Sequence, residues 1–339
     1  MLLRTGLKNW RSALRAPLRV TLMRRAGRKN PSGEREQVPE ERQGSAVCLG
    51  NFDGVHIGHR LLLEQTALAA RQRGLRAVAY TFSEHPSVLL EGERRPLLSL
   101  PEERNALIGQ LGVQVIEEDF RAVQELSAQE FFERILLGQL RAEILLCGEG
   151  HRFGVGAAGD TALLQRLCSA AGVTLLVLPP VKLGGETVSS SRIREAVARG
   201  EVEHAARMLG RPFSVTGEVV QGKRLGRTIG VPTINQALPE GRVTPRFGVY
   251  AARVELDGVR YVGAANVGLR PTVSGEGVNL ETHLVGYKGD LYGRIVTVEL
   301  LRHLRDERRF PSVEELKRQM EKDVEQACAV AEQAVGQVY

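Results

Sequence analysis

The chain of 339 residues has few cysteines and no long apolar segment. Its four cysteines are widely spaced and form neither a metal-ligand nor a redox pattern, which excludes a disulfide scaffold and a zinc module: Cys48, Cys147, Cys168 and Cys328. No stretch approaches the roughly 20 apolar residues that cross a bilayer, and none resembles a secretory signal. We therefore expect a cytoplasmic protein.

Positive charge is concentrated at the N-terminus. The formal net charge is +6, and residues 1–33 contain lysines and arginines but no acidic residue. Leucines and Trp10 recur there at helical spacing, which is typical of a basic amphipathic helix that binds a membrane or nucleic acid. A basic, flexible extension over residues 1–44 is the simpler interpretation. The remaining chain is close to neutral, so we expect no nucleic-acid partner and, outside this arm, no membrane contact.

Residues 45–211 alternate between short β-rich runs and helical patterns. The runs are SAVCLG, LRAVAYTF, VQVIEE, EILLCG and VTLLVLP, with amphipathic stretches such as HRLLLEQTALAARQRG and SAQEFFERILLGQL between them. This alternation predicts right-handed crossovers in a doubly wound, parallel α/β sheet. Ligands of such sheets bind at the carboxyl ends of the strands, and the unusual residues of this half follow those ends.

The pattern changes after residue 211. Runs separated by glycine-containing turns predict an antiparallel sheet or small β-barrel: FSVTGEVVQG, GVYAARVELDG, YVGAANVG, NLETHLVGY and RIVTVELLRHL. A C-terminal helix begins after Ser312, which fits an N-cap, with Glu315 at the third helical position. We therefore expect two domains, residues 45–211 and 212–339, behind the extension 1–44.

The segment GNFDGVHIGH follows the first predicted strand and opens a helix. Helix N-termini bind phosphate because free backbone N–H groups and the helix dipole favour negative charge. If the helix begins near Val55, His56 and His59 share one face at that end. Two imidazoles there can hydrogen-bond a triphosphate, and Gly58 lets its backbone come close. A histidine pair alone is usually a packed or surface pair, but the surrounding glycines favour function.

Three further loops follow strands of the same predicted sheet. TFSEHP places His85 at one strand end, and CGEGHRFGVGAAGD places Arg152 at another. VSSSRIREAV opens a helix with Ser190, Ser191 and Arg194 near its start, which is typical of a phosphate clamp. No nucleophile triad accompanies them. This suits phosphoryl or nucleotidyl transfer, where positioning and charge stabilisation do most of the work.

The second half has a phosphate pattern of its own. QGKRLGRTIG combines glycines, whose backbone amides can face phosphate, with basic side chains: Gly222, Lys223, Gly226 and Arg227. In the following PTIN, Thr233 and Asn235 point to one side of a strand and offer oxygen ligands for Mg²⁺ bound to a nucleotide. Glu281 stands in an alternating strand, where most carboxylates simply face solvent.

Six of these segments occur in the order of a known enzyme family. GNFDGVHIGH, TFSEHP, GHRFG, SSSRIR, GRTIGVPTIN and NLETHL resemble the bacterial bifunctional riboflavin kinase/FAD synthetases, over roughly residues 45–339. The resemblance implies an HxGH-type nucleotidyltransferase domain followed by a β-barrel riboflavin kinase domain. It implies that ATP phosphorylates riboflavin to FMN and then adenylates FMN to FAD with release of pyrophosphate, both with Mg²⁺.

The same resemblance implies roles for individual residues. His56 and His59 are implied in adenylyl transfer, and Glu281 as the general base that takes the proton of the riboflavin hydroxyl. The implied ATP and phosphate ligands are Gly50, Asn51, Asp53, Gly58, Ser190, Ser191, Arg194, Gly222, Lys223, Gly226 and Arg227. Thr233 and Asn235 are the implied Mg²⁺ ligands, and candidates for the flavin side are Phe52, His85 and Arg152.

One departure from the family pattern leaves alternatives open. The usual GxDFxFG, or its Asn variant, reads GEGHRFG here, so Gly150 lacks the usual polar side chain. A kinase-only enzyme, whose first domain is a nucleotide-binding module, is therefore an alternative to a bifunctional one. An aminoacyl-tRNA synthetase with the same HIGH string is another, although no KMSKS-like segment is present. A weak homo-oligomer also stays open.

Overall fold

The computed structural model describes the chain except for residues 1–42, 85, 93–94, 222–232, 273–274 and 335–339. The described residues form two compact units. The first runs to Val188 apart from Pro96–Leu98, and the second combines Pro96–Leu98 with the residues from Ser189 onward. Five predicted site residues lie outside the described residues, as does most of the predicted extension 1–44: His85, Gly222, Lys223, Gly226 and Arg227.

A five-stranded parallel sheet forms the centre of the first unit, in the order β3-β2-β1-β4-β5. The strands are β1 (Ser45–Leu49), β2 (Arg76–Phe82), β3 (Gln114–Glu118), β4 (Ala142–Gly148) and β5 (Thr174–Leu178). In the middle strand, Val47 pairs with Val78 of β2 on one side and with Leu145 of β4 on the other. Each strand coincides with one predicted run, so the prediction of a parallel sheet is confirmed.

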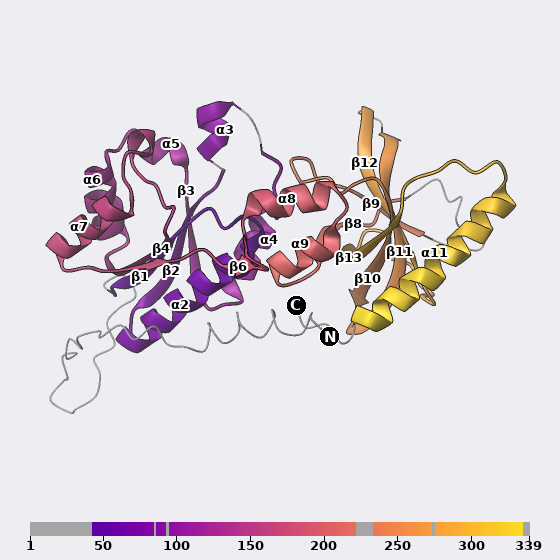
Figure 1. Ribbon diagram of the computed structural model, residues 1–339, viewed down its shortest axis with the longest axis horizontal. Coiled ribbons are helices and arrows are strands. Elements are labelled where there is room, and N and C mark those ends of the chain that lie inside the picture. The colour runs from indigo at the N-terminus through magenta and orange to yellow at the C-terminus, as the bar shows by residue number, and fades with distance from the viewer. Residues whose placement is uncertain (1–42, 85, 93–94, 222–232, 273–274, 335–339) are drawn as a thin grey trace. The chain divides into compact units, whose positions relative to one another are not determined.

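Helices cover both faces of this sheet (Figure 1), and a hydrophobic core fills each interface. On one face, Ala46 and Cys48 of β1 pack with residues of α2 (Ile57–Arg73) and α4 (Pro101–Gly109). On the other face, Val47 and Leu49 pack with residues of η3 (Phe131–Gln139) and α7 (Thr161–Ala171). Successive strand residues point to opposite faces, so a strand buried on both sides is apolar from Ala46 to Leu49, and the buried Ser45 hydroxyl donates to the Leu140 carbonyl.

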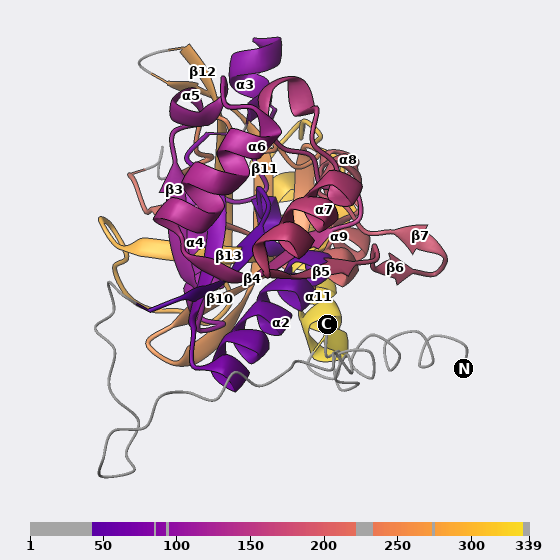
Figure 2. The same ribbon diagram turned by 90° about the vertical axis from the view of Figure 1, so that its left-hand side faces the viewer.

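Short elements complete the first unit. They are η2 (Asp53–Val55), α3 (Pro86–Glu91), α5 (Phe120–Val123), α6 (Ala128–Glu130) and η4 (Val155–Ala157). A hairpin of β6 (Lys182–Leu183) and β7 (Glu186–Thr187) projects away from the sheet (Figure 2). The predicted helix over residues 127–140 differs in kind, because η3 is a π-helix. Its wider turn buries Phe131, Phe132 and Leu136 in one core.

The second unit is built on a curled antiparallel sheet of six strands, in the order β8-β13-β10-β11-β12-β9. The strands are β8 (Phe213–Glu218), β9 (Thr233–Ala237), β10 (Gly248–Leu256), β11 (Val259–Thr272), β12 (Gly275–Leu284) and β13 (Ile295–Arg305). The backbone N–H of Val220, just beyond β8, donates to the carbonyl of Asn235 in β9 at 2.8 Å, which joins the two ends of the sheet. The predicted antiparallel, barrel-like sheet is confirmed as a half-barrel.

Among the residues that the structure describes, the second unit has three helices: α8 (Ser190–Ala198), α9 (Val202–Leu209) and α11 (Val313–Ala334). The predicted C-terminal helix is confirmed, since the Ser312 hydroxyl caps α11 by accepting from the Glu315 N–H at 3.2 Å. An apolar face of α11 packs on the sheet through Ala327, Val330 and Ala331. The division of domains at residues 211 and 212 stays a prediction; α8 and α9, which precede it, lie with the curled sheet.

Candidate active sites

The loop from β1 to α2 is the most constrained turn of the first unit. Phe52 and Val55 have φ values of 54° and 38°, in the left-handed region that a β-branched residue rarely adopts. The loop is held by Ser99, whose N–H donates to Asp53 Oδ1 at 3.1 Å and whose hydroxyl accepts from the Gly54 N–H at 3.0 Å. Strained backbone that is fixed in this way is typical of functional sites. The Asp53 carboxylate therefore supports the loop.

His56 and His59 lie together at the N-terminus of α2. The helix begins at Ile57 rather than near Val55, and His56 is its N-cap. Its Nδ1 accepts from the His59 N–H at 3.2 Å, so in the neutral ring the proton resides on Nε2. The two rings stack with centroids 3.6 Å apart and planes inclined by 17°. The prediction that the two side chains lie together at the N-terminus of the helix is confirmed, although only His59 is a helical residue.

Burial controls the protonation of His59. The pKa of His59 is lowered well below its ordinary value, first by burial and then by the neighbouring His56. Its Nδ1 is buried and makes no hydrogen bond to any described residue. The neutral ring therefore retains a hydrogen-bonding position that can serve a ligand at the helix N-terminus.

Two small residues and one aromatic ring shape the loop around the pair. A Cβ on Gly58 would lie 3.2 Å from His56 Cε1, and a Cβ on Gly50 would lie 3.2 Å from the ring of Phe52. Phe52 is fully buried and meets His59 edge-on, with ring centroids 5.4 Å apart. Side chains at these glycines would push the rings aside. Phe52 therefore packs against His59, and it does not line the cavity of the first unit.

A cavity of about 630 Å³ opens beside this loop in the first unit. Gly50 and Asn51 form one part of its wall, and the loop after β4, including Arg152, forms another. The carbonyl of Asn51 accepts from the Thr81 hydroxyl at 3.3 Å, which ties the wall to β2. The exposed Arg152 pairs with Asp160 at 3.8 Å. The structure thus brings three predicted site residues together around one cavity at the carboxyl end of the sheet.

The cavity wall also contains residues that the sequence did not single out. Six of them have aromatic rings: Tyr80, Phe82, Phe120, Phe131, His151 and Phe153. The imidazole of His151 stacks on Phe153 at 6.0 Å, and burial lowers its pKa to about 4. Tyr80 and Phe82 end the run LRAVAYTF, so aromatic residues at a strand end were the available signal. A wide, aromatic cavity fits a large planar ring.

The serine-rich segment forms the N-terminus of α8 in the second unit. Ser189 is the N-cap, and its hydroxyl accepts from the Arg192 N–H at 3.4 Å. Ser190 and Ser191 are therefore the first two helical residues, with Arg194 one turn later. This arrangement places two hydroxyls at the positive end of a helix, which is chemically suited to phosphate.

The second unit pairs a hydroxyl with a carboxylate on adjacent strands. Thr233 Oγ1 donates to Glu281 Oε1 at 2.7 Å. Glu281 in β12 lies directly opposite Asn235 in β9, and Asn279 donates from Nδ2 to Asn235 Oδ1 at 3.2 Å. The antiparallel register therefore gathers Thr233, Asn235 and Glu281, as the sequence predicted. Their oxygens form a compact polar group.

A cavity of about 270 Å³ adjoins this group. Thr233, Glu281 and His283 line its polar end, while apolar side chains from α11 and the sheet line the rest: Val249, Leu316, Met320 and Val324. The segment after β13 closes one side with Arg305, Glu307, Arg308 and Phe310. One polar and one apolar end suit a substrate that joins a hydroxyl chain to a ring system.

The donor atoms near Thr233 fit a hard cation that arrives with a nucleotide. No described residues form a group of three or more His, Cys, Asp or Glu side chains able to hold a metal by themselves. Mg²⁺ needs only one or two protein oxygens when substrate phosphates and water complete its shell. Thr233 Oγ1 and Asn235 Oδ1 offer such oxygens beside the Glu281 carboxylate.

Two families match the chain, one in each half. The FAD synthetase family matches residues 38–192, and the riboflavin kinase family matches residues 209–331. The bifunctional riboflavin kinase/FMN adenylyltransferase of Pseudomonas fluorescens is 38% identical over 86% of this chain and 94% of that protein. The protein of the same name from Escherichia coli K12 is 38% identical over 85% of this chain and 92% of that protein. These matches favour a bifunctional enzyme over a kinase alone and over an aminoacyl-tRNA synthetase.

One solved structure is similar over most of the chain. It is described as a macrolide-efflux protein from Streptococcus pneumoniae, with a TM-score of 0.76, 31% identity, and coverage of 85% of this chain and 96% of that one. Among the described residues of the present chain, no helix is long and apolar enough to span a membrane.

Proposed function

We propose that this chain, which belongs to the family of bifunctional riboflavin kinase/FMN adenylyltransferases, transfers phosphate from ATP to riboflavin and then AMP from a second ATP to FMN. One observation carries the proposal: each compact unit has its own cavity, and each cavity adjoins a polar group suited to one of the two reactions. Both reactions use ATP and typically a divalent metal, for which we propose Mg²⁺. We place the protein in the cytoplasm.

Glu281 is the proposed base of the kinase reaction. Its carboxylate accepts the proton of the riboflavin 5′-hydroxyl as that oxygen attacks the γ-phosphorus of ATP, and the bond to the β-phosphate oxygen breaks to release ADP. The hydrogen bond from Thr233 holds the carboxylate in place before substrate binds. Mg²⁺, when bound, offsets charge on the phosphates, and Thr233 and Asn235 are its proposed ligands.

The apolar half of the same cavity is the proposed site of the flavin ring. Phe310, Leu316 and Met320 offer aromatic and aliphatic surface at the end away from the Thr233 hydroxyl. A flavin ring placed there can direct its ribityl chain toward Glu281, because Glu281 lines the same cavity. The predicted phosphate ligands Gly222, Lys223, Gly226 and Arg227 remain part of the proposal from sequence.

His56 and His59 are the proposed centre of adenylyl transfer. A phosphate oxygen of FMN attacks the α-phosphorus of ATP, and pyrophosphate leaves. Charge that develops on the phosphate oxygens is stabilised by imidazole N–H groups and by the N-terminus of α2. Gly50, Asn51 and Gly58 are proposed to approach the nucleotide. Ser190, Ser191 and Arg194 remain proposed phosphate ligands from sequence. Arg152 is the proposed contact of the flavin side, with Phe52 and Asp53 holding the loop.

Product analysis tests both activities together. The purified protein is incubated with riboflavin, ATP and Mg²⁺, and FMN and FAD are separated by chromatography over time. We expect FMN to appear first and FAD to follow. FMN without FAD would leave a kinase alone, and the absence of both products would overturn the proposal.

Metal and location are tested separately. Removal of divalent metal with a chelator is expected to stop both reactions, and added Mg²⁺ is expected to restore them. Fractionation of the source cells is expected to recover the protein with the cytosolic enzymes; recovery in the membrane fraction would contradict the proposed location.

A further inference from the structure

A carboxylate is buried on the side of α11 that faces the curled sheet. Asp323 is only 3% exposed, and the residues one turn before and after it on the same face are Met320 and Ala327. Burial of a charge in such an apolar stripe is strongly unfavourable unless the charge is paired and hydrogen-bonded. The partners of Asp323 therefore explain why an acidic residue stands there.

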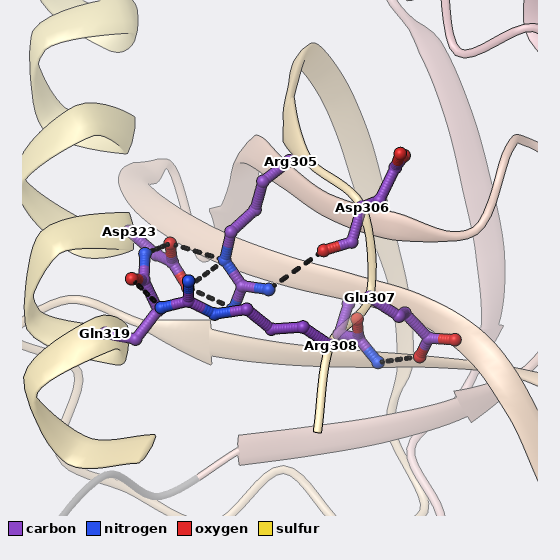
Figure 3. Close-up of polar contacts among 7 residues, drawn as sticks. Arg305, Asp306, Glu307, Arg308, Gln319 and Asp323 are labelled. Atoms are coloured by element: carbon purple, nitrogen blue, oxygen red, sulfur yellow. Dashed lines mark hydrogen bonds and ion pairs between the residues drawn. The ribbon is translucent and has the colours of Figure 1, made fainter. Parts of the chain in front are cut away.

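Arg305, the last residue of β13, pairs with this carboxylate in a bidentate manner. Its Nε lies 3.0 Å from Oδ1 and its Nη2 lies 2.7 Å from Oδ2 of Asp323. Gln319 donates from Nε2 to Oδ1 at 2.7 Å. Figure 3 shows these three side chains meeting between α11 and the end of the strand. Fork-to-fork pairs of this kind fix the orientation of the guanidinium as well as its position.

The contacts continue into the segment that closes the cavity. Gln319 also accepts a hydrogen bond from Arg308 Nη2, so its amide bridges Asp323 and Arg308 (Figure 3). Both guanidinium groups lie over the ring of Phe310, with Cζ at 5.6 Å for Arg305 and 4.7 Å for Arg308. Cation–π contacts hold an aromatic ring in a fixed orientation. Asp323 thus determines, through two arginines, where the Phe310 ring lies.

The same segment is fixed to the strand beside the proposed base. Glu307 Oε1 accepts from Asn266 Nδ2 at 3.0 Å, and Asn266 lies directly opposite Glu281 in the pairing of β11 with β12. The wall that contains Phe310 is therefore held at two points. Glu307 ties it to the polar end of the cavity, and Asp323 ties it to α11.

We propose that Asp323 is a positioning residue for the flavin substrate of the kinase reaction, acting through Arg305 and, by way of Gln319, through Arg308 to hold the Phe310 wall of the cavity. The inference rests on the proposed kinase function. Both carboxylate oxygens of Asp323 are already engaged by protein donors, so it acts on the wall and takes no part in proton transfer. Its loss loosens the apolar end of the cavity and leaves Thr233 and Glu281 in register.

The test compares Asp323→Asn with wild type in steady-state phosphorylation of riboflavin. Asn keeps the size of the side chain and removes the charge that orients Arg305. We expect the KM for riboflavin to rise about tenfold, equivalent to about 1.4 kcal/mol, with kcat and the KM for ATP within about twofold. Gln319→Leu, which removes the bridge between Asp323 and Arg308 but keeps the pair of Asp323 with Arg305, is expected to raise the same KM by a smaller factor.

Asp257 provides a matched control, because its ion pair with an arginine is exposed and not buried. Asp257 forms a bidentate pair with Arg294 at 2.9 and 3.1 Å, but the pair is exposed and lies outside the cavity lining. Asp257→Asn therefore removes a similar pair and is expected to leave the KM for riboflavin unchanged. Conversion of supplied FMN to FAD, assayed in all three variants, is an internal measure of correctly folded protein and is expected to be unchanged.

The outcomes separate this inference from the proposed function. If wild type forms no FMN, the kinase proposal itself fails. If wild type forms FMN but Asp323→Asn lowers only kcat, raises the KM for ATP, or changes the melting temperature without changing the KM for riboflavin, the positioning role is overturned. A Gln319→Leu variant that binds riboflavin as wild type does would remove the link through Arg308.

Discussion

The two candidate sites differ in how their polar groups are held. In the second unit, Thr233 and Glu281 come from neighbouring antiparallel strands and are already hydrogen-bonded at 2.7 Å. In the first unit, His56 and His59 come from one loop-to-helix junction, and the cavity beside that loop is lined from β2, α5, η3 and the loop after β4. Side chains on paired strands are placed by the backbone hydrogen bonds between the strands. Side chains at strand ends are placed by the conformation of the turn that follows each strand. The first site is therefore more sensitive to loop sequence.

The largest effect is expected at the base of the kinase site. Glu281→Gln keeps an oxygen that can accept from Thr233 but cannot take a proton at neutral pH, so FMN formation should fall by about 10²–10⁴-fold. Conversion of supplied FMN to FAD should stay at the wild-type rate, measured by chromatography. The same substitution at Glu299, which pairs with Arg253 on the same sheet, should spare both reactions. Equal loss of both reactions in Glu281→Gln would contradict two separate sites.

The reciprocal effect is expected in the first unit. His59→Ala removes an imidazole from the N-terminus of α2, so FAD formation from FMN should fall by about 10²–10³-fold. Phosphorylation of riboflavin should be unchanged in the same preparation. His204→Ala on α9 removes an imidazole outside both cavities and is the control. A His59→Ala enzyme that makes FAD normally would show that adenylyl transfer does not use this pair.

Acid should weaken the first unit through its buried imidazoles. The pKa of His151 is lowered from 6.5 to about 4 by burial, so the folded protein binds fewer protons than the unfolded chain. Above pH 6.5 the imidazole is neutral in both the folded and the unfolded protein. As the pH falls from 6.5 toward 4, only the unfolded chain binds the proton, and the free energy of unfolding decreases, by on the order of 2 kcal/mol at pH 5. Urea unfolding followed by circular dichroism at pH 7.5 and pH 5 measures this loss.

His151→Phe isolates that contribution. The substitution keeps an aromatic ring to stack on Phe153 and removes the titrating group. The variant should lose less stability between pH 7.5 and pH 5 than wild type does. His59 acts in the same direction, so some acid dependence should remain. Equal losses in variant and wild type would show that His151 is not held in the neutral form.

The smallest effect is expected at Gly150. A Cβ at this position would meet no atom within 4 Å, so a side chain fits without displacement of its neighbours. Gly150→Asn restores the amide of the usual family pattern beside the cavity, and one added hydrogen bond should raise FAD formation by up to about tenfold. The matched change Gly109→Asn, also in open space but on α4, should leave the rate unchanged. A rate that stays constant in Gly150→Asn would assign no role to the missing side chain.

Strand and helix assignments followed from local patterns. Apolar runs such as SAVCL and alternating runs such as NLETHL predicted the strands, because burial on two faces or on one face imposes those patterns. The kinase group was also predictable, since alternate residues of adjacent strands meet once the pairing is known. The π-helix η3 was not predictable, because its extra residue per turn depends on how Phe131 and Phe132 fit the core.

Contacts between distant residues were beyond the sequence. Nothing local relates Asp53 to Ser99, or Asp323 to Arg305, since these pairs are brought together only by the folded loops and by the docking of α11. The aromatic residues that line the cavity of the first unit are also brought together only by the fold. They come from β2, α5, η3 and the loop after β4, each with an ordinary apolar or turn-like sequence.

By itself, the sequence determined most of the strands and helices and predicted which motifs carry phosphate chemistry, because these depend on periodicity and on residues close together in the chain. Only the tertiary structure decided that His56 caps α2 and stacks on His59, that Thr233 bonds to Glu281, and that Asp323 is buried against Arg305. The reason is physical: the burial that shifts a pKa or requires a partner for a charge is created by segments far apart in the chain.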